Sequence, residues 1–114
     1  MIRKYTFPKH LRLRNSTEFQ SVYKRGAKKT SRSFVVFVMA NGLEHSRFGV
    51  TTPRKLGPAH ERNRIKRRVR ELIRTSRPLF PAGFDVVLNP RGSVGERELG
   101  ELQRELLSFF EHSI

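Results

Sequence analysis

Residues 61–74 read ERNRIKRRVRELIR, and the architecture of the whole chain can be built outward from them. Their apolar residues recur at i, i+4, i+7 and i+8, the spacing of one face of an α-helix. The four residues of this apolar stripe are Ile65, Val69, Leu72 and Ile73. Pro58 suits the first turn of a helix, and Pro78 cannot continue one. We therefore expect a helix from Pro58 to about Ser76, with its apolar face packed on a core.

The other side of this predicted helix is strongly cationic. Seven of the nine residues from Arg62 to Arg70 are Lys, Arg or Asn. Like charges at i, i+3 and i+4 repel by about a few tenths of a kcal/mol per pair, and phosphate groups would relieve that repulsion. Arg outnumbers Lys here, which suits bidentate contact with phosphate. The alternative is a charged face that meets only solvent.

The composition of the whole chain agrees with a polyanionic partner. Its 114 residues include 24 Lys and Arg against 10 Asp and Glu, for a formal net charge of +14. The basic excess lies in residues 1–77, whereas residues 78–114 carry more acids than bases. This length indicates a single domain over residues 1–114. It excludes a large two-domain enzyme, and the charge excludes an ordinary, charge-balanced metabolic protein.

Several classes of protein are excluded by what the sequence lacks. There is no Cys, which rules out disulfides, thiolate nucleophiles and iron–sulfur clusters. Residues 1–10 contain charges but no apolar segment typical of a secretory signal. No run approaches the roughly 18 apolar residues of a membrane span. We therefore expect a cytoplasmic protein with no membrane partner.

The remaining elements follow from apolar patterning and from Gly, Pro and Asn punctuation. We expect a helix over 16–25, a polar connection over 27–32, strands over 33–40, 47–52 and 84–88, and a last helix over 93–111. Asn15 and Glu18 have the spacing of a capping box, and Gly26 suits the C′ position that ends the first helix. The first two strands should pair as an antiparallel hairpin.

The order α-β-β-α-β-α predicts an α+β fold, a two-layer sandwich in which helices cover one face of a small sheet. Part of the other face would remain available for a ligand. Phe19 and Tyr23 lie one turn apart on the first helix, and Phe34 and Phe37 have opposite parity on the first strand, so at least one could line that open face. Aromatic rings beside cations form a stacking platform for single-stranded bases. The alternative for each Phe is a place in the core.

Three further cations lie where the predicted strands end. Arg54 and Lys55 follow the second strand, and Arg91 follows the third, so all three could edge one groove or could simply be loop charges. Residues for catalysis are sparse, because the chain has one Asp, Asp85, and its four His have no metal-binding spacing. His60 could serve as a general base, but no partner for it can be identified. We predict no catalytic and no metal-ligating residue, and a domain that recognises an anion.

Five segments, in order, resemble the bacterial ribonuclease P protein subunit over about residues 11–110. The segment RNRIKRRVRE resembles the signature helix of that family, and RFGVTTPRKLG resembles the strand and loop before it. The other three are RNSTEFQSVYKRG, SRSFVVF and FDVVLNPR, which resemble its first helix, first strand and third strand. Any one segment would be modest, but five in the right order and spacing are specific.

This resemblance implies an RNA partner and a reaction. Proteins of the family bind a large catalytic RNA, and together they cut the 5′ leader from precursor tRNA. The Mg²⁺ ions used would be held mainly by the RNA and the substrate, with no organic cofactor and no obligate protein partner. The family fold also implies a left-handed βαβ crossover.

Carried over by position, the resemblance assigns two sets of residues. Those that would bind the catalytic RNA are Arg62, Asn63, Arg64, Lys66, Arg67 and Arg70. Those of the cleft for the single-stranded leader would be Phe19, Tyr23 and Phe37, with Arg54, Lys55 and Arg91 nearby. The alternatives from a different class are a non-enzymatic ribosomal or general RNA-binding protein and, more weakly, a helix that binds duplex DNA.

Overall fold

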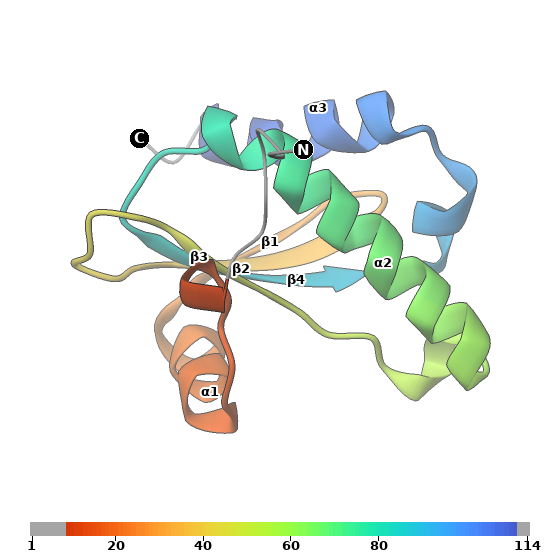
Figure 1. The fold of residues 1–114 in the computed structure, drawn as a ribbon, viewed down its shortest axis with the longest axis horizontal. Coiled ribbons are helices and arrows are strands. Elements are labelled where there is room, and N and C mark those ends of the chain that lie inside the picture. The colour runs from red at the N-terminus through yellow and green to blue at the C-terminus, as the bar shows by residue number, and fades with distance from the viewer. Residues whose placement is uncertain (1–8, 112–114) are drawn as a thin grey trace, which may run out of the picture.

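Seven helices and strands make up the part of the chain described by this computed structural model, residues 9–111. In chain order they are α1 (Ser16–Arg25), β1 (Ala27–Thr30), β2 (Phe34–Ala40), β3 (Arg47–Val50), α2 (Ala59–Ser76), β4 (Phe84–Pro90) and α3 (Leu99–Glu111). Short 3-10 turns lie before α1, before and after α2, and before α3. The predicted α+β class is confirmed, with helices on both faces of one sheet (Figure 1). Among residues 9–111, no helix has the length and apolarity needed to cross a membrane.

The four strands lie in the order β1-β2-β4-β3. β2 pairs antiparallel with β1 on one edge and with β4 on the other, and β3 pairs parallel with β4. The predicted hairpin of 33–40 with 47–52 is therefore wrong, because β4 lies between those strands. Val86, Val87 and Leu88 of β4 are all buried, as expected of a central strand covered on both faces.

The strand β1 differs from the prediction, because the sequence predicts only a polar connection over residues 27–32. Ala27–Thr30 pairs with β2 in the register Ala27↔Val38 to Thr30↔Val35, so the observed order is α-β-β-β-α-β-α. The sequence AKKT has no apolar alternation because the strand lies at the edge of the sheet and is mostly exposed. Charged side chains on an edge strand also discourage pairing with other molecules.

The main core lies between the sheet and the helices α2 and α3. The predicted stripe of α2 is confirmed, because Ile65, Val69, Leu72 and Ile73 are all at most 3% exposed. They pack with Phe34 and other buried residues of β2, β4 and α3. Burying each such side chain contributes about 1.5–3 kcal/mol to folding. This layer therefore supplies most of the apolar burial in the fold.

The helix α1 lies on the opposite face of the sheet from α2 and α3 (Figure 1), so the prediction that helices cover one face fails for α1. Its contact is small, a cluster of the buried residues Leu13, Val22 and Val87 with partly buried aromatic neighbours. The rest of this face beside α1 stays uncovered by helices.

Local features at the two ends of α1 explain its boundaries. The capping box is confirmed, because the Asn15 side chain accepts from the Glu18 backbone N–H at 2.9 Å and the Glu18 carboxylate accepts from the Asn15 N–H. Gly26 ends the helix, but with φ −77° it is not in the left-handed conformation of a C′ glycine. A Cβ on Gly26 would lie 2.5 Å from the carbonyl oxygen of Val22 and 3.1 Å from that of Val38. The glycine is needed for this close approach of α1 to β2.

An ionic network ties the start of α1 to the sheet. The carboxylate of Asp85, 2% exposed, accepts from Arg47 Nε at 2.9 Å and Nη2 at 2.7 Å, and from Asn41 Nδ2 at 2.9 Å. The third guanidinium nitrogen of Arg47 donates to Glu18 at 2.8 Å. These bonds raise the pKa of Arg47, mainly through Asp85. The pKa of Glu18 is lowered, first because the Arg14 backbone N–H donates to its carboxylate.

The last helix, α3, begins at Leu99 and not at the predicted residue 93. Residues 92–96 form a 3-10 turn. Arg68 of α2 donates through Nε to the carbonyl oxygen of Val94 at 3.2 Å and through Nη2 to that of Arg97. These bonds tie the 3-10 turn and the segment before α3 to α2.

Candidate nucleic-acid interface

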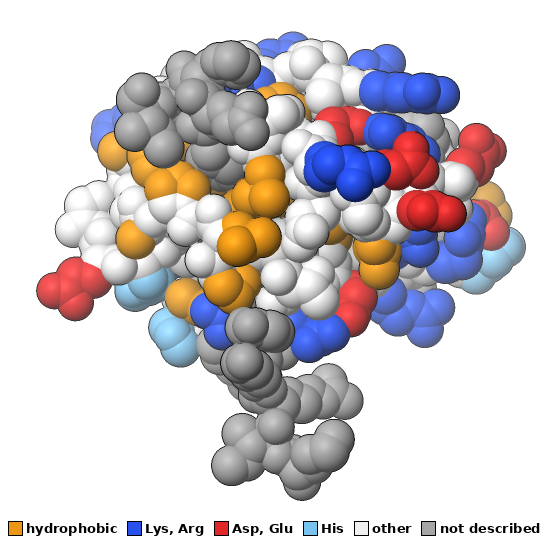
Figure 2. All heavy atoms as spheres, turned by 90° about the horizontal axis from the view of Figure 1, so that it is seen from above, with side chains coloured by type: hydrophobic (Ala, Val, Ile, Leu, Met, Phe, Trp, Pro, Cys, Tyr) orange, Lys and Arg blue, Asp and Glu red, His pale blue; other side chains and the backbone are white. Residues whose placement is uncertain are grey.

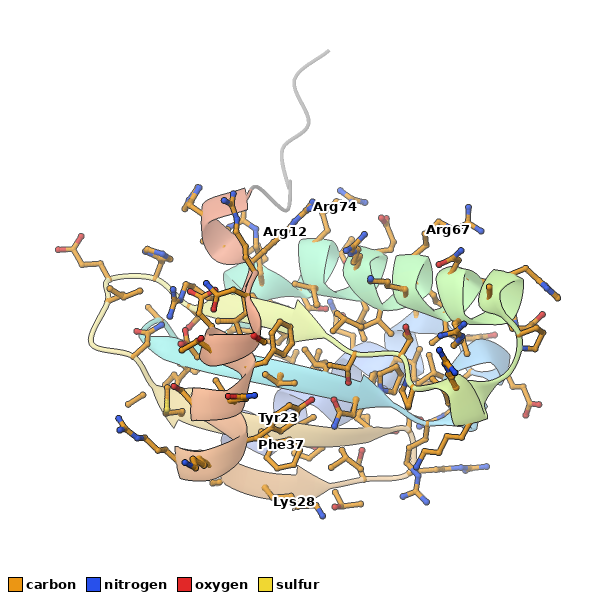
Figure 3. All side chains as sticks on the ribbon, turned by 90° about the horizontal axis from the view of Figure 1, so that it is seen from below. Arg12, Tyr23, Lys28, Phe37, Arg67 and Arg74 are labelled. Carbon is orange, nitrogen blue, oxygen red and sulfur yellow. The ribbon has the colours of Figure 1, made fainter. Side chains whose placement is uncertain are left out.

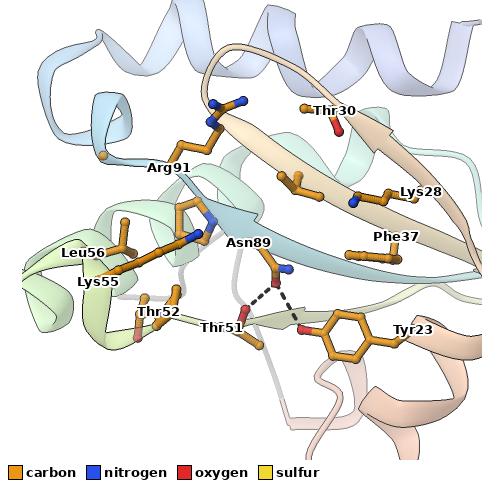
Figure 4. Close-up of a pocket in the computed structure, with 14 residues that line it drawn as sticks. Tyr23, Lys28, Thr30, Phe37, Thr51, Thr52, Lys55, Leu56, Asn89 and Arg91 are labelled. Atoms are coloured by element: carbon orange, nitrogen blue, oxygen red, sulfur yellow. Dashed lines mark hydrogen bonds between the residues drawn. The ribbon is translucent and has the colours of Figure 1, made fainter.

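A groove of about 950 Å³ opens on the uncovered sheet face beside α1. Its walls come from the end of α1, from β1, β2 and β4, and from the segment that leads from β3 toward α2 (Figure 4). The lining combines aromatic rings, hydroxyl groups, an amide and cations. These residues are Tyr23, Lys28, Thr30, Val35, Phe37, Thr51, Thr52, Pro53, Lys55, Leu56, Asn89, Pro90, Arg91 and Gly92.

Two aromatic rings form one side of the groove. Tyr23 of α1 meets Phe37 of β2 edge to face, with ring centroids 4.8 Å apart and planes at 85° (Figure 3). The alternation of β2 explains this placement, because Phe34 is fully buried while Phe37 faces α1 and the groove. Tyr23 is 38% exposed, which leaves aromatic surface open to a ligand. The expectation that one Phe of this strand lines an open face is confirmed.

The charged side chains that line the groove are all cationic. They are Lys28 from β1, Lys55 from the turn before α2, and Arg91 from the end of β4. Arg91 is steadied by a hydrogen bond from Nη1 to the carbonyl oxygen of Ser31 at 3.2 Å. Of the six predicted cleft residues, the structure brings together Tyr23, Phe37, Lys55 and Arg91 in this groove. Arg54 belongs to the same turn as Lys55 but is not among the lining residues.

Phe19 lies outside this groove, in a second hollow between the N-terminal segment, α1, β3 and α2. We call this the Phe19 hollow; it is lined by Arg12, Leu13, Arg14, Phe19, Phe48, Gly49, Val50, Lys66 and Arg70. The Phe19 ring lies over β3, where a Cβ on Gly49 would come within 2.5 Å of it. The sequence placed Phe19 with Tyr23 because they are one turn apart, but Phe19 packs over β3 on the side toward α2.

The cations of the Phe19 hollow crowd one another. The pKa of Arg12 is lowered, first by burial and then by the charges of Arg70 and Arg14. Lys66 and Arg70 line both this hollow and a neighbouring one on α2. A negatively charged group bound here would relieve the repulsion between these side chains.

The neighbouring hollow follows the outer side of α2 and is lined by His60, Asn63, Lys66, Arg67 and Arg70. We call these residues the α2 basic face. Four of the six residues predicted to bind a catalytic RNA therefore lie together. Asn63, Arg67 and Arg70 are exposed, and Arg67 extends away from the helix (Figure 3).

The other two predicted residues of α2 lie off this face. Arg64 pairs with Glu61 at 3.1 Å, and its guanidinium would lie 2.9 Å from a Cβ on Gly95. Arg62 is half-buried, and its Nε atom has no hydrogen-bond partner among the described residues. Across α2 and α3, basic side chains are interspersed with acidic ones (Figure 2). The lining of the groove, like that of the α2 basic face, contains no acidic side chain.

The other residues that line the groove were not predicted, and three of them have polar side chains that bear on its chemistry: Lys28, Thr51 and Asn89. Asn89 accepts at Oδ1 from the Tyr23 hydroxyl at 3.2 Å and from the Thr51 hydroxyl (Figure 4). Lys28 was missed because β1 was missed. Asn89 did carry a signal, since it is a polar residue two positions after Val87 in a strand that is otherwise mostly apolar.

Within residues 9–111, no three His, Asp or Glu side chains come together in a way that could hold a metal ion. Neither the groove nor the α2 basic face contains a carboxylate. Both surfaces have the chemistry to bind anions, and the groove also has aromatic rings on which unpaired bases can stack. The absence of catalytic residues from this chain stays a prediction.

Comparison with known proteins gives concordant results. The family model described as ribonuclease P matches residues 7–113. The ribonuclease P protein component of Thermotoga petrophila is 41% identical over 91 residues, which cover 80% of this chain and 78% of that protein. The component of Syntrophus aciditrophicus is 32% identical over 105 residues, covering 92% and 88% of the two chains.

Solved structures agree in fold. The RNase P protein from Thermotoga maritima superposes with a TM-score of 0.76 at 35% identity, covering 86% of this chain and 93% of that one. The Staphylococcus aureus RNase P protein gives a TM-score of 0.74 at 28% identity, with coverage of 90% and 94%.

Proposed function

Because this chain belongs to the ribonuclease P protein family, we propose that its groove binds the single-stranded 5′ leader of precursor tRNA while its α2 basic face binds the catalytic RNA. The chain is a protein component of ribonuclease P. Two surfaces that meet different RNA segments would let one small protein hold enzyme and substrate together.

The observation that carries the leader assignment is the open edge-to-face pair of Tyr23 and Phe37 beside Lys28, Lys55 and Arg91. Bases can stack on such rings only when they are unpaired, and each stacked base contributes about 1–3 kcal/mol to binding. Cations along the same groove attract the phosphates of that strand. The leader is the single-stranded part of the substrate.

The α2 basic face supports the assignment to the catalytic RNA. Asn63, Arg67 and Arg70 are exposed on a helix whose other face is committed to the core, so they can bind without any change in the fold. Lys66 and Arg70 extend this surface into the Phe19 hollow. Phe19 then acts mainly by holding α1 on β3, and the roles of Arg54, Arg62 and Arg64 stay predictions.

In this proposal the RNA performs the cleavage and the protein alone does not. Mg²⁺ ions held mainly by the RNA and the substrate would supply an activated water for hydrolysis. The groove is an unfavourable place for a divalent cation, because its charged lining is made of Lys and Arg. The chain's own residues bind and orient the leader, in a complex we place in the cytoplasm.

Reconstitution tests this function. The purified protein should restore leader cleavage by a bacterial ribonuclease P RNA at low Mg²⁺, where the RNA alone is slow. A general RNA-binding protein of matched charge is the control and should give no such stimulation. Absence of stimulation by this protein would contradict the proposal.

A further inference from the structure

The turn that joins β1 to β2 is bonded to a carboxylate from the other side of the sheet. This turn runs from Ser31 to Phe34, and the Ser31 N–H donates to the Phe34 carbonyl oxygen at 2.8 Å. Two-residue turns between antiparallel strands favour a positive φ at a central residue, whereas neither Arg32 nor Ser33 has a positive φ. Hydrogen bonds from outside the hairpin therefore contribute to the shape of this turn.

The carboxylate belongs to Glu105 of α3, whose side chain is only 12% exposed. It accepts from the backbone N–H of Ser33 at 2.8 Å and from the Ser31 hydroxyl. An ionised carboxylate can only accept. The one hydroxyl hydrogen of Ser31 therefore points to Glu105 and not to the carbonyl oxygen of Phe34, which is farther away at 3.3 Å.

Glu105 is ionised because its neighbours favour its negative charge. Burial by itself would raise the pKa of this carboxyl group, but hydrogen bonds from Ser31 and Ser33 and the charge of Arg97 outweigh burial and lower the pKa. Arg97 donates through Nη1 to the carboxylate and to the Ser33 hydroxyl, the latter at 2.9 Å. One polar network therefore joins α3 to the turn.

The same turn orients an arginine of the groove. The carbonyl oxygen of Ser31 accepts from Arg91 Nη1 at 3.2 Å, and that of Ser33 accepts from the Arg91 backbone N–H at 2.8 Å. Arg91 extends from the end of β4 beside this turn (Figure 4). A chain of hydrogen bonds thus leads from Glu105, on the face that α2 and α3 cover, to a cation that lines the groove.

An arginine that is oriented before RNA arrives binds a phosphate at a lower cost. A free arginine side chain has many rotamers, and ordering it on a phosphate loses conformational entropy. The bond to the turn restricts Arg91 in advance, so less of that entropy is lost on binding. The turn can therefore contribute to affinity without touching RNA.

We propose that Glu105 is a positioning residue for RNA binding in the groove: it holds the turn through Ser31, and the turn holds the Arg91 guanidinium where a phosphate of the leader meets it. This inference rests on the proposed function, because it takes the strand in the groove to be the leader. Glu105 acts through Arg91 and not by its own contact with RNA.

The affinities of the assembled protein–RNA enzyme for precursor and mature tRNA test this role. We define the leader gain as Kd for mature tRNA divided by Kd for precursor tRNA. Arg91→Ala should lower the gain about fivefold, near the largest effect of one exposed ion pair. It should also reduce the slope of log K against log salt by about 0.7, the value for one phosphate of a single strand. Glu105→Ala and Ser31→Ala should each lower the gain about threefold, because Arg91 keeps its charge but loses its orientation.

Two further variants are matched controls. Glu101 lies one turn earlier in α3 and pairs with Arg97 at 3.3 Å. Glu101→Ala therefore removes the same charge from the same helix, and should leave the leader gain unchanged. Ser31→Thr keeps the hydroxyl and should retain most of the gain. Circular dichroism checks that each variant is folded before assembly, and if Glu105→Ala does not fold, the two Ser31 variants decide the test.

Double variants separate positioning from a merely structural role. In the Arg91→Ala background, Glu105→Ala and Ser31→Ala should cause no further loss of leader gain, since the guanidinium through which they act is already absent. A merely structural role would weaken binding of both tRNAs alike, or would lower the gain by the same factor with and without Arg91.

The outcomes for the two levels of the proposal differ. A wild-type leader gain of one would contradict the proposed function of the groove. A gain above one that Arg91→Ala leaves unchanged, or that Glu105→Ala and Ser31→Ala leave unchanged, would overturn only the role of Glu105. A loss from Ser31→Ala that persists in full in the Arg91→Ala background would overturn that role as well.

Discussion

Neighbouring residues of the same strands serve opposite faces of the sheet. On the face beneath α2 and α3, Phe34 and Leu88 are fully buried. On the face beside α1, Phe37 and Asn89 line the groove. The pleat of a strand sends alternate side chains to opposite faces, so one short strand can contribute to stability and to binding at once. Substitutions at adjacent positions should therefore have different effects.

The largest expected effect is on the covered face. Leu88→Ala should lower the free energy of unfolding by about 3 kcal/mol, because it removes packed methyl groups and leaves a cavity. Urea denaturation followed by circular dichroism measures this. The adjacent Asn89→Ala, which removes two hydrogen bonds at a half-buried position, should cost only about 1 kcal/mol. Equal losses would mean that the two faces do not differ as described.

The next largest effect concerns Asp85, a buried polar residue on the face of the sheet beside α1. It tests whether a polar residue of that face can also contribute to stability. Asp85→Asn should lower the free energy of unfolding by about 2 kcal/mol, since it weakens the charged hydrogen bonds from Arg47. It should also weaken leader binding, because Arg47 links the sheet to α1, which carries Tyr23. Stability measured by urea and affinity for precursor tRNA should fall together. A loss of neither would show that the ionic network does not position α1.

A smaller effect is expected at the α2 basic face, where a substitution should weaken RNA binding and leave the free energy of unfolding unchanged. Arg67→Ala should weaken assembly with the catalytic RNA and reduce the slope of log K against log salt by about 1. Filter binding at several salt concentrations measures this slope. Arg104→Ala, which removes an exposed arginine of α3, is the matched control. The same change in slope for both variants would contradict a localised site.

The smallest effect is a pH dependence at the start of α1. The pKa of Glu18 is lowered from its ordinary value of 4.5 in the folded protein, so its contribution is present above that pH and lost as the pH falls below it. Glu18→Gln should cost under about 1 kcal/mol at pH 7, because the site is partly exposed, and should make stability fall less steeply in acid. Urea denaturation from pH 7 downward measures this. Glu44→Gln on the exposed loop after β2 should retain the wild-type pH profile.

The residues that pack on the covered face could be predicted from the sequence, because their apolar side chains recur at a regular spacing. Residues 61–74 repeat their apolar positions at helical spacing, and the capping box of Asn15 and Glu18 is local. Such signals need no knowledge of the rest of the chain. The bounds of α1 and the core face of α2 were therefore correct.

The open face was harder to predict because it depends on which strands pair. β1 has no apolar pattern. β4 lies between β2 and β3, and because this pairing joins segments that are far apart in the sequence, the order of the strands along the chain does not indicate it. The groove contains Lys28 and Asn89 only because of that pairing. Phe19 was placed with Tyr23 on helical spacing alone, and the separation of their sites follows from the position of Gly49 on β3.

We assign the leader to the groove and the catalytic RNA to the α2 basic face. This assignment is tested most directly by comparing the affinities of the assembled enzyme for precursor and mature tRNA. Phe37→Ala should weaken binding of precursor tRNA by about tenfold, the loss of one stacked base, and leave binding of mature tRNA nearly unchanged. Leu79→Ala, which removes an exposed apolar side chain elsewhere, should affect neither. An equal loss of affinity for the two tRNAs in the Phe37 variant would contradict the assignment of the groove to the leader.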